Sequence, residues 1–200
     1  MQKLILPINN VKVTASIDTT SYTRRFGFRH YGVDMVSIKG DVRLWGSGNG
    51  KVVASGWDNN CGRVLVVVYE DAIQNKNGTV KPITFRYFHL SKVMVSIGQQ
   101  VTKDTLLGWY GSTGRYAGNS AHLHLEADTD TRYVLYTPTV QSSNYLKGIH
   151  QGATPFDSPK NTVENPLNWL YCKASAPDYQ TYITAKDAFI RSEDFSLPLF

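Results

Sequence analysis

The stretch "AHLHLEAD", residues 121–128, alternates apolar and polar side chains with a period of two. Side chains two positions apart in a β-strand emerge on the same face, so the alternation predicts a strand. One face would carry Leu123 and Leu125, and the other His122, His124 and Glu126. This second face is either the polar side of a half-buried strand or part of a metal site, and the rest of the chain decides between them.

The rest of the chain also favours β-structure. Its 200 residues suit one domain with or without an appendage, and 42% hydrophobic residues support a packed core. Short runs rich in β-branched residues, separated by Gly, Asn and Asp, follow one another from residue 3 to about residue 110. No stretch has a long apolar repeat of 3.6 residues. The sequence therefore predicts a mostly β fold of antiparallel sheets with few short helices.

Glycine-rich segments mark the turns of this fold. "DAIQNKNGTVK" (71–81) contains an Asn-Gly pair and predicts the tip of a hairpin. "GSGNGK" (46–51) and "GSTGRYAG" (111–118) lack the spacing of a phosphate-binding loop and a following helix, so we interpret both as turns. "ENPLNWLYC" (164–172) predicts a helical turn with proline at its first position. Residues 173–200 have weak periodicity and predict a tail or small appendage.

Composition excludes several classes of partner. The net charge of +5 allows weak attraction to polyanions, but the basic residues are scattered and no nucleic-acid-binding motif is present. We therefore expect no nucleic-acid partner, and no apolar run reaches the roughly 18 residues of a membrane span. The N-terminal residues lack the features of a secretory signal. Cys61 and Cys172 are too far apart for a CxxC pair, which leaves either a disulfide or two free buried thiols.

A second motif offers partners for the histidine strand. In "HYGVD", His30 and Asp34 are an even number of positions apart, which would place both on one strand face, and Gly32 would allow close backbone approach. Adding one histidine from residues 121–128 makes a His, Asp, His set, which suits zinc with an open fourth position for water. Zinc can lower the pKa of such a water to roughly 7.

A third motif, "YFHL", contains His89, and the three together resemble the LytM/lysostaphin family of zinc metalloendopeptidases, peptidase family M23. "HYGVD", "GKVVASG", "YFHLS", "VSIGQQVTKDTLLGWYGSTG" and "SAHLHLE" occur in the family's order, and "ENPLNWL" resembles its closing segment. The resemblance implies antiparallel sheets that form a groove with zinc on its floor. It also implies a peptidase domain over 1–172, with core motifs at 26–126 and an insertion at about 129–163.

The resemblance assigns roles to five residues. His30, Asp34 and His124 would bind one zinc ion. His89 and His122 would lie beside the metal, orient or deprotonate water, and stabilise the oxyanion formed at the attacked carbonyl. Which of these two is the general base stays open.

Four further residues have two interpretations each. Glu126 either orients an imidazole as a neighbour of the metal ligands or forms a surface salt bridge. Tyr87 either lines the cleft or packs in the core. Asn60 and Asn119 lie in glycine-rich turns that either border a substrate groove or are only loops.

The expected function is zinc-dependent hydrolysis of peptide bonds in bacterial peptidoglycan, in stem peptides or cross-bridges, at the cell wall outside the cytoplasm. Without a recognisable signal, the chain is either a phage-borne lysin or virion enzyme or a domain trimmed from an exported protein. One alternative is a non-catalytic scaffold or activator that binds wall or a partner protein, and another is a peptidase of glycine-rich proteins. The bond that is cut and the oligomeric state stay open.

Overall fold

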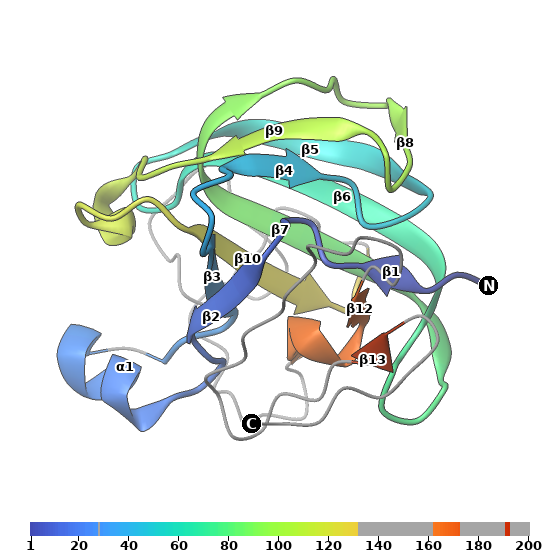
Figure 1. The fold of residues 1–200 in the computed structure, drawn as a ribbon, viewed down its shortest axis with the longest axis horizontal. Helices are drawn as coiled ribbons and strands as arrows, with labels where there is room; N and C mark the ends of the chain where they lie inside the picture. Colours follow the sequence, from blue (N-terminus) through green and yellow to red (C-terminus); the bar gives the residue numbers. More distant parts are fainter. Residues whose placement is uncertain (28, 132–161, 173–190, 193–200) are drawn as a thin grey trace.

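A computed structural model of the chain describes residues 1–27, 29–131, 162–172 and 191–192 (Figure 1). The first half of these residues forms β1 (Leu4–Ile5), β2 (Val11–Ala15), α1 (Thr20–Phe26), β3 (Val33–Ser37), β4 (Arg43–Trp45), β5 (Gly50–Asp58), β6 (Gly62–Ile73) and β7 (Val80–Val93). The second half forms β8 (Gln100–Val101), β9 (Leu106–Tyr110), the 3-10 helix η1 (Arg115–Ala117), β10 (Leu123–Asp128), β11 (Val163–Glu164), the 3-10 helix η2 (Pro166–Asn168), β12 (Leu170–Cys172) and β13 (Arg191–Ser192). The predicted mostly β class is confirmed.

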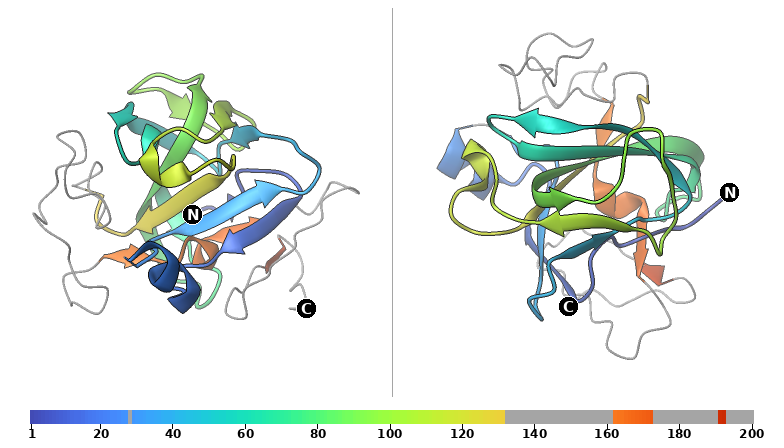
Figure 2. Two further views of the ribbon diagram at one scale, coloured as in Figure 1. Left: turned by 90° about the vertical axis from the view of Figure 1, so that its left-hand side faces the viewer. Right: turned by 90° about the horizontal axis from the view of Figure 1, so that it is seen from above.

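One large antiparallel sheet dominates the molecule. Its strands follow the order β2-β3-β10-β7-β6-β5-β8, with β11 beside β10 and the β4–β9 pair attached through β9 to β7. The long strand β7 pairs with β6 and β10 over its first part and with β9 at Leu90–Val93. Figures 1 and 2 show the sheet curling so that β4 and β9 lie across from β3 and β10.

The valine-rich strand β6 is buried on both faces. Leu65 and Val67 belong to the main hydrophobic core, whereas Val64 and Val66 pack in a smaller cluster with Phe88. Alternate side chains of a strand point to opposite faces, so a continuous apolar run fits a strand that is covered on both sides. Strand β6 therefore anchors β7, which supplies one of the histidines.

Both chain ends contribute to a smaller sheet. Strands β1, β12 and β13 pair in parallel, and the amide of Leu6 donates to the carbonyl of Tyr171. The turn that precedes β12 is η2, in which the Asn165 side chain accepts a hydrogen bond from the Leu167 amide at 3.0 Å and proline occupies the first turn. This confirms the predicted helical turn in residues 164–172.

Several local predictions can be compared with the structure. The hairpin at 71–81 is confirmed, although the strands extend into it and leave only residues 74–79 as the connection. The segment 111–118 is a turn that contains η1, as expected. Helix α1 was not predicted, because all its residues are at least partly exposed and it has no apolar stripe.

Further predictions concern the two cysteines, the insertion and the C-terminal tail. Cys61 and Cys172 are both buried and form no disulfide, so the disulfide alternative is wrong. Most of the predicted insertion at 129–163 and of the tail at 173–200 lies outside the described residues. In the part of the chain that is described, no helix is both long and apolar enough to cross a membrane.

Gly62, at the start of β6, provides a test of close backbone packing. Its φ is +71°, and an added Cβ would lie 2.2 Å from Oγ1 of Thr113. Gly27 also has a positive φ, +80°, but a Cβ there would have no atom within 4 Å. A positive φ costs an alanine roughly 1–2 kcal/mol, and overpacking adds about 1–3 kcal/mol. We expect Gly62→Ala to lower the free energy of unfolding clearly more than Gly27→Ala in urea titrations. Equal losses would contradict the tight packing of Gly62 on Thr113.

Candidate metal centre

Three side chains from distant parts of the chain converge in the interior. Nε2 of His30 lies 3.0 Å from Oδ1 of Asp34, and Nδ1 of His124 lies 2.9 Å from the same oxygen. The two imidazole nitrogens are 3.0 Å apart. All three residues are at most 9% exposed, and their ligand atoms lie within 4.8 Å of one another. The predicted His, Asp, His set is therefore brought together in space.

Strand pairing explains most of this convergence. Asp34 in β3 lies directly opposite His124 in β10. Strand β3 begins only at Val33, so the prediction that His30 and Asp34 share a strand face is wrong. His30 lies in the preceding segment and reaches Asp34 because the chain passes close to β10 at Gly32. A Cβ on Gly32 would lie 2.3 Å from the Leu125 carbonyl oxygen, which confirms the expected close approach.

The hydrogen bonds on the far side of each ring indicate which nitrogens have free lone pairs. His30 donates from Nδ1 to the carbonyl of Ser16 at 2.8 Å, which leaves Nε2 as an acceptor. His124 donates from Nε2 to Oε1 of Glu126 at 3.4 Å, which leaves Nδ1 as an acceptor. With both rings neutral, two lone pairs and a carboxylate oxygen thus face one another and need a cation, either a proton or a metal ion, between them. Nitrogen and oxygen donors of this kind fit Zn²⁺.

The electrostatics of the cluster agree with that need for positive charge. Burial alone would raise the pKa of Asp34, but the neighbouring His30 and the hydrogen bonds from His124 and His30 outweigh it and hold that pKa well below its usual range. Burial alone would lower the pKa of His124, but Asp34 and Glu126 outweigh it and raise that pKa to about 9. Without a metal ion, both shifts place a proton on His124 beside the Asp34 carboxylate, and a metal ion bound there would displace that proton.

A buried ion network supports His124 from behind. Glu126 lies opposite Arg86 in the β10–β7 pairing, and Nη1 of Arg86 is 3.6 Å from Oε2 of Glu126. Nη2 of Arg86 is 2.7 Å from Oδ2 of Asp128. Because Glu126 is 0% exposed and contacts the His124 ring, the orienting interpretation is favoured and a surface salt bridge is wrong. Arg86 and Asp128 were not singled out from the sequence.

The other two predicted histidines lie beside this cluster. The ring centroids of His89 and His122 are 4.9 Å apart, and Nε2 of His122 is 3.8 Å from Oδ1 of Asp34. His89 donates from Nδ1 to the carbonyl of Thr113, and His122 does so to the carbonyl of Ser120, each at 2.8 Å. In the neutral form of each ring, Nε2 is therefore the acceptor. Burial, with the nearby imidazoles, lowers the pKa of His89 to about 3, so this ring is neutral.

The backbone conformation of His89 explains how β7 places this ring beside His122. Phe88 lies opposite His124 in the pairing, and its ring stacks on that imidazole with centroids 5.2 Å apart. Regular alternation would then turn His89 toward the core, where Tyr87 lies fully buried. His89 instead has φ of +62°, in the left-handed region, which breaks the alternation. Tyr87 therefore packs in the core and does not line the cleft, so its packing interpretation is confirmed.

A cleft of about 1040 Å³ opens over Asp34 and His122. Its lining comes mainly from two segments, residues 14–22 with Arg25 and Phe26, and residues 116–122. Asn119 borders this cleft, as one interpretation expected, whereas Asn60 is not among its lining residues.

Tyr22 of α1 covers one of the candidate metal ligands, His30, on the cleft side. Its ring stacks on His30 with centroids 4.1 Å apart and 16° between the planes. Burial raises the pKa of its hydroxyl well above the usual value, and the charge of Asp34 adds to that shift. Tyr22 was missed from the sequence, because no periodic pattern in residues 20–26 links it to the histidine motifs.

The fold and this cluster define the class of the protein. A mostly β domain holds a His, Asp, His set with two further imidazoles alongside, which is the donor set of a zinc hydrolase with an open metal position. The sequence model of peptidase family M23 matches residues 28–135. The chain belongs to peptidase family M23, a family of zinc metallopeptidases.

Curated relatives lie in the same family. The chain is 33% identical over 155 residues to the glycyl-glycine endopeptidase ALE-1 of Staphylococcus capitis, covering 75% of this chain and 38% of that protein. It is 33% identical to lysostaphin of Staphylococcus simulans over 102 residues, which are 50% of this chain and 18% of that protein. It is 32% identical to the peptidoglycan DD-endopeptidase ShyA of Vibrio cholerae over 97 residues, which are 48% of this chain and 20% of that protein. The chain thus spans less than two fifths of the length of these relatives.

Solved structures support the fold alone. A zinc-containing peptidase from Vibrio cholerae superposes with a TM-score of 0.50 and 22% identity, over 63% of this chain and 36% of that one. A structure of the SpoIIQ–SpoIIIAH pore-forming complex superposes with a TM-score of 0.54 and 20% identity, over 85% of this chain and 92% of that one.

The contact between Glu126 and His124 can be tested by metal affinity. Glu126→Gln keeps the shape of the side chain but removes the negative charge that orients the imidazole, so zinc affinity should fall roughly 10- to 100-fold. Competition with a chromophoric chelator measures this change. Glu164→Gln is a matched control, because Glu164 instead accepts hydrogen bonds from Gln74 and Trp169. Unchanged affinity in Glu126→Gln would show that Glu126 does not orient the ligand.

Proposed function

We propose that this chain is a zinc-dependent endopeptidase that hydrolyses peptide bonds in bacterial peptidoglycan. The observation that supports it most is that His30, Asp34 and His124 meet beside two further imidazoles, His89 and His122, under a cleft that Asp34 and His122 line. Family membership and relatives named as glycyl-glycine and DD-endopeptidases agree with this activity. We assign the activity to residues 1–172, with 173–200 as an appendage to that domain.

In this proposal His30, Asp34 and His124 hold one zinc ion. Zinc in such a set lowers the pKa of a bound water and polarises a carbonyl. The Nδ1–H group of His89 and that of His122 are each held by a backbone carbonyl, so Nε2 is the atom of each ring that exchanges a proton with the water. One imidazole takes the proton of the attacking water, and the proton then passes to the leaving amine. The imidazolium formed in this way donates a hydrogen bond to the oxyanion before it gives up the proton, and the other imidazole orients the water by accepting a hydrogen bond at Nε2.

The site of action in this proposal is the bacterial cell wall, outside the cytoplasm. Lysis and remodelling use the same chemistry, and so does a lysin carried by a phage particle. A scaffold that binds wall without cutting would not need two acceptor imidazoles beside a complete ligand set. Zinc content, hydrolysis of wall peptides and the separate roles of the histidines therefore distinguish the enzyme from a scaffold.

Isolated peptidoglycan sacculi provide the first test. Purified protein should release amino groups without reducing sugar ends, a chelator should abolish the release, and added zinc should restore it. Mass spectra of the fragments then identify the bond. Stoichiometric zinc without release from several wall types would point to a binding scaffold, and released reducing ends would contradict peptide-bond cleavage.

The roles of His124 and His122 can be separated by substitution. His124→Ala removes a proposed ligand, so zinc content and hydrolysis should be lost together. His122→Ala removes proton transfer only, so the protein should retain zinc while kcat falls by roughly 10²–10⁴. Zinc analysis by mass spectrometry and single-substrate kinetics measure both. Full hydrolysis by His124→Ala, or equal zinc loss in both variants, would mean that these roles are wrongly assigned.

Thr113 holds His89 in position and gives a third test. Its hydroxyl donates to the Leu90 carbonyl at 2.9 Å and accepts from the Arg63 amide at 3.0 Å, while its own carbonyl accepts from His89. Thr113→Val removes both hydroxyl contacts and should lower kcat by about tenfold, which equals roughly 1.4 kcal/mol, with zinc retained. Thr113→Ser keeps the hydroxyl and should retain most of the rate. Equal kcat values for both variants would refute this positioning role.

A further inference from the structure

The charges that line the cleft are few. Among the described lining residues, the lysine, arginine, aspartate and glutamate side chains are only Asp18, Arg25 and Asp34. Most of the others are small and polar or apolar, from residues 14–21 on one side and 117–121 on the other. A peptide bound in this cleft would therefore contact few charged groups. Each of these charged groups can favour one substrate over another.

Two of these three charges already have partners. Asp34 contacts both histidines of the proposed zinc site. Asp18 forms an ion pair with Arg29, with 3.1 Å between Oδ1 and Nε. No ion pair of Arg25 occurs among residues 1–27, 29–131, 162–172 and 191–192. Arg25 is thus the lining cation whose charge remains available to a ligand.

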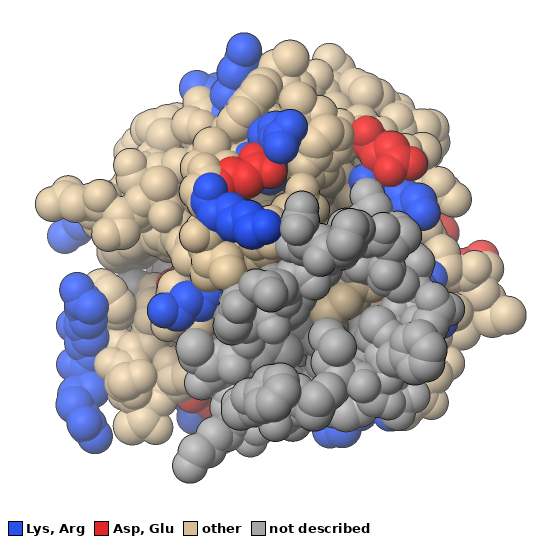
Figure 3. Space-filling view, in the orientation of Figure 1, with Lys and Arg blue, Asp and Glu red and all other residues tan. Residues whose placement is uncertain are grey.

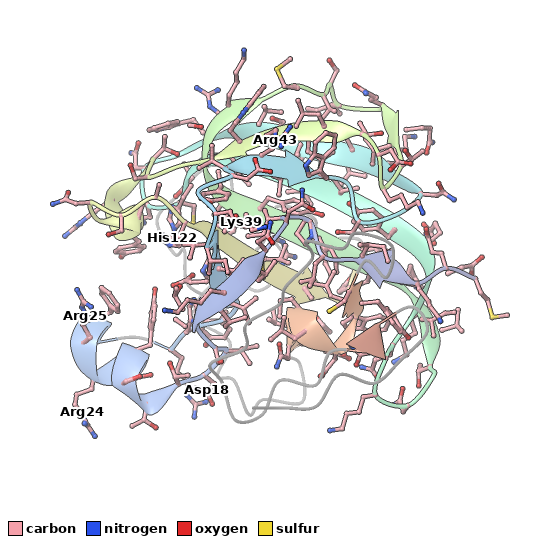
Figure 4. All side chains as sticks on the ribbon, in the orientation of Figure 1. Asp18, Arg24, Arg25, Lys39, Arg43 and His122 are labelled. Carbon is pink, nitrogen blue, oxygen red and sulfur yellow. The ribbon has the colours of Figure 1, made fainter. Side chains whose placement is uncertain are left out.

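The side chain of Arg25 is directed toward the substrate side of α1. Figure 4 shows it rising from the helix on the side that faces His122 and the η1 turn, whereas Arg24 extends away from that side. In Figure 3 a hollow separates the basic side chains at this edge from the body of the molecule. The guanidinium also lies 5.1 Å from the centroid of the Phe26 ring, an aromatic platform that is 44% exposed.

We propose that Arg25 binds a free carboxylate of the substrate peptide at the α1 end of the cleft. A guanidinium presents two parallel N–H groups that match a carboxylate, and a flat aromatic ring beneath it limits its orientations. This inference rests on the proposed peptidase function and specifies its substrate. Stem peptides of peptidoglycan have free carboxylates along their length, whereas the interior of an oligoglycine bridge has none. The preferred substrate is therefore a cross-linked acidic stem peptide.

The test uses pairs of synthetic cross-linked stem peptides that differ only in a free carboxylate or its carboxamide, together with a neutral oligoglycine peptide. The zinc-loaded wild type, Arg25→Gln and Arg24→Gln are compared by kcat and KM on each peptide. Arg24→Gln is the matched control, because it removes the neighbouring charge of the same helix without changing the lining of the cleft.

For the wild type, KM should be roughly tenfold lower on the acid than on the amide, since one charge-assisted contact of about 1.4 kcal/mol equals that factor. Arg25→Gln should remove this preference by raising KM on the acid alone, and Arg24→Gln should retain it. The preference should shrink at high ionic strength, because the contact is exposed to solvent.

The outcomes separate this inference from the function on which it rests. If the wild type cleaves no peptide and no sacculi, the proposed function fails. If the wild type cleaves the acid and the amide with equal KM, or if Arg24→Gln loses the preference as fully as Arg25→Gln, the carboxylate contact is refuted while the peptidase stands. Faster cleavage of the oligoglycine peptide than of either stem peptide also overturns the assigned substrate.

Discussion

The antiparallel pairing of β10 with β3 on one side and β7 on the other is the constraint on which the site depends. It sets His124 opposite Asp34 and Glu126 opposite Arg86. Strand β10 therefore joins two candidate metal ligands on the side of β3, and it joins the carboxylate that supports them to its arginine on the side of β7. A slip of one residue would move each of these side chains to the opposite face of the sheet. The buried apolar neighbours Leu123 and Leu125 oppose such a slip, because it would exchange them with charged groups.

Burial of charge next to the cluster has a structural cost that the network of Arg86 offsets. An unpaired carboxylate in the interior is strongly unfavourable, and Arg86 serves both Glu126 and Asp128. Glu126 is thereby held where it contacts His124. Three of the imidazoles are oriented by backbone carbonyls instead of side chains. Their tautomers therefore follow from the main-chain path and are insensitive to most substitutions nearby.

Chemistry and substrate choice come from different parts of the fold. Asp34, His124 and the residues that support them lie in the centre of the large sheet, whereas α1 and residues 116–122 line the cleft. Walls of this kind tolerate variation because they contribute little to the core. The relatives named as glycyl-glycine and DD-endopeptidases illustrate two specificities within one family. We propose Arg25 as the feature of this wall that favours an acidic peptide.

The sequence by itself determined the β class and the Asn-Gly hairpin, because alternation and turn motifs are local properties. Its resemblance to the M23 family indicated that five named side chains belong together. Only the tertiary structure decided that His30 precedes its strand, that a left-handed backbone turns His89 to the site, and that Tyr22 and Arg86 belong to it. These features depend on burial and on contacts between residues far apart in the chain. No local pattern encodes them, since the same residue types are as common on an exposed surface.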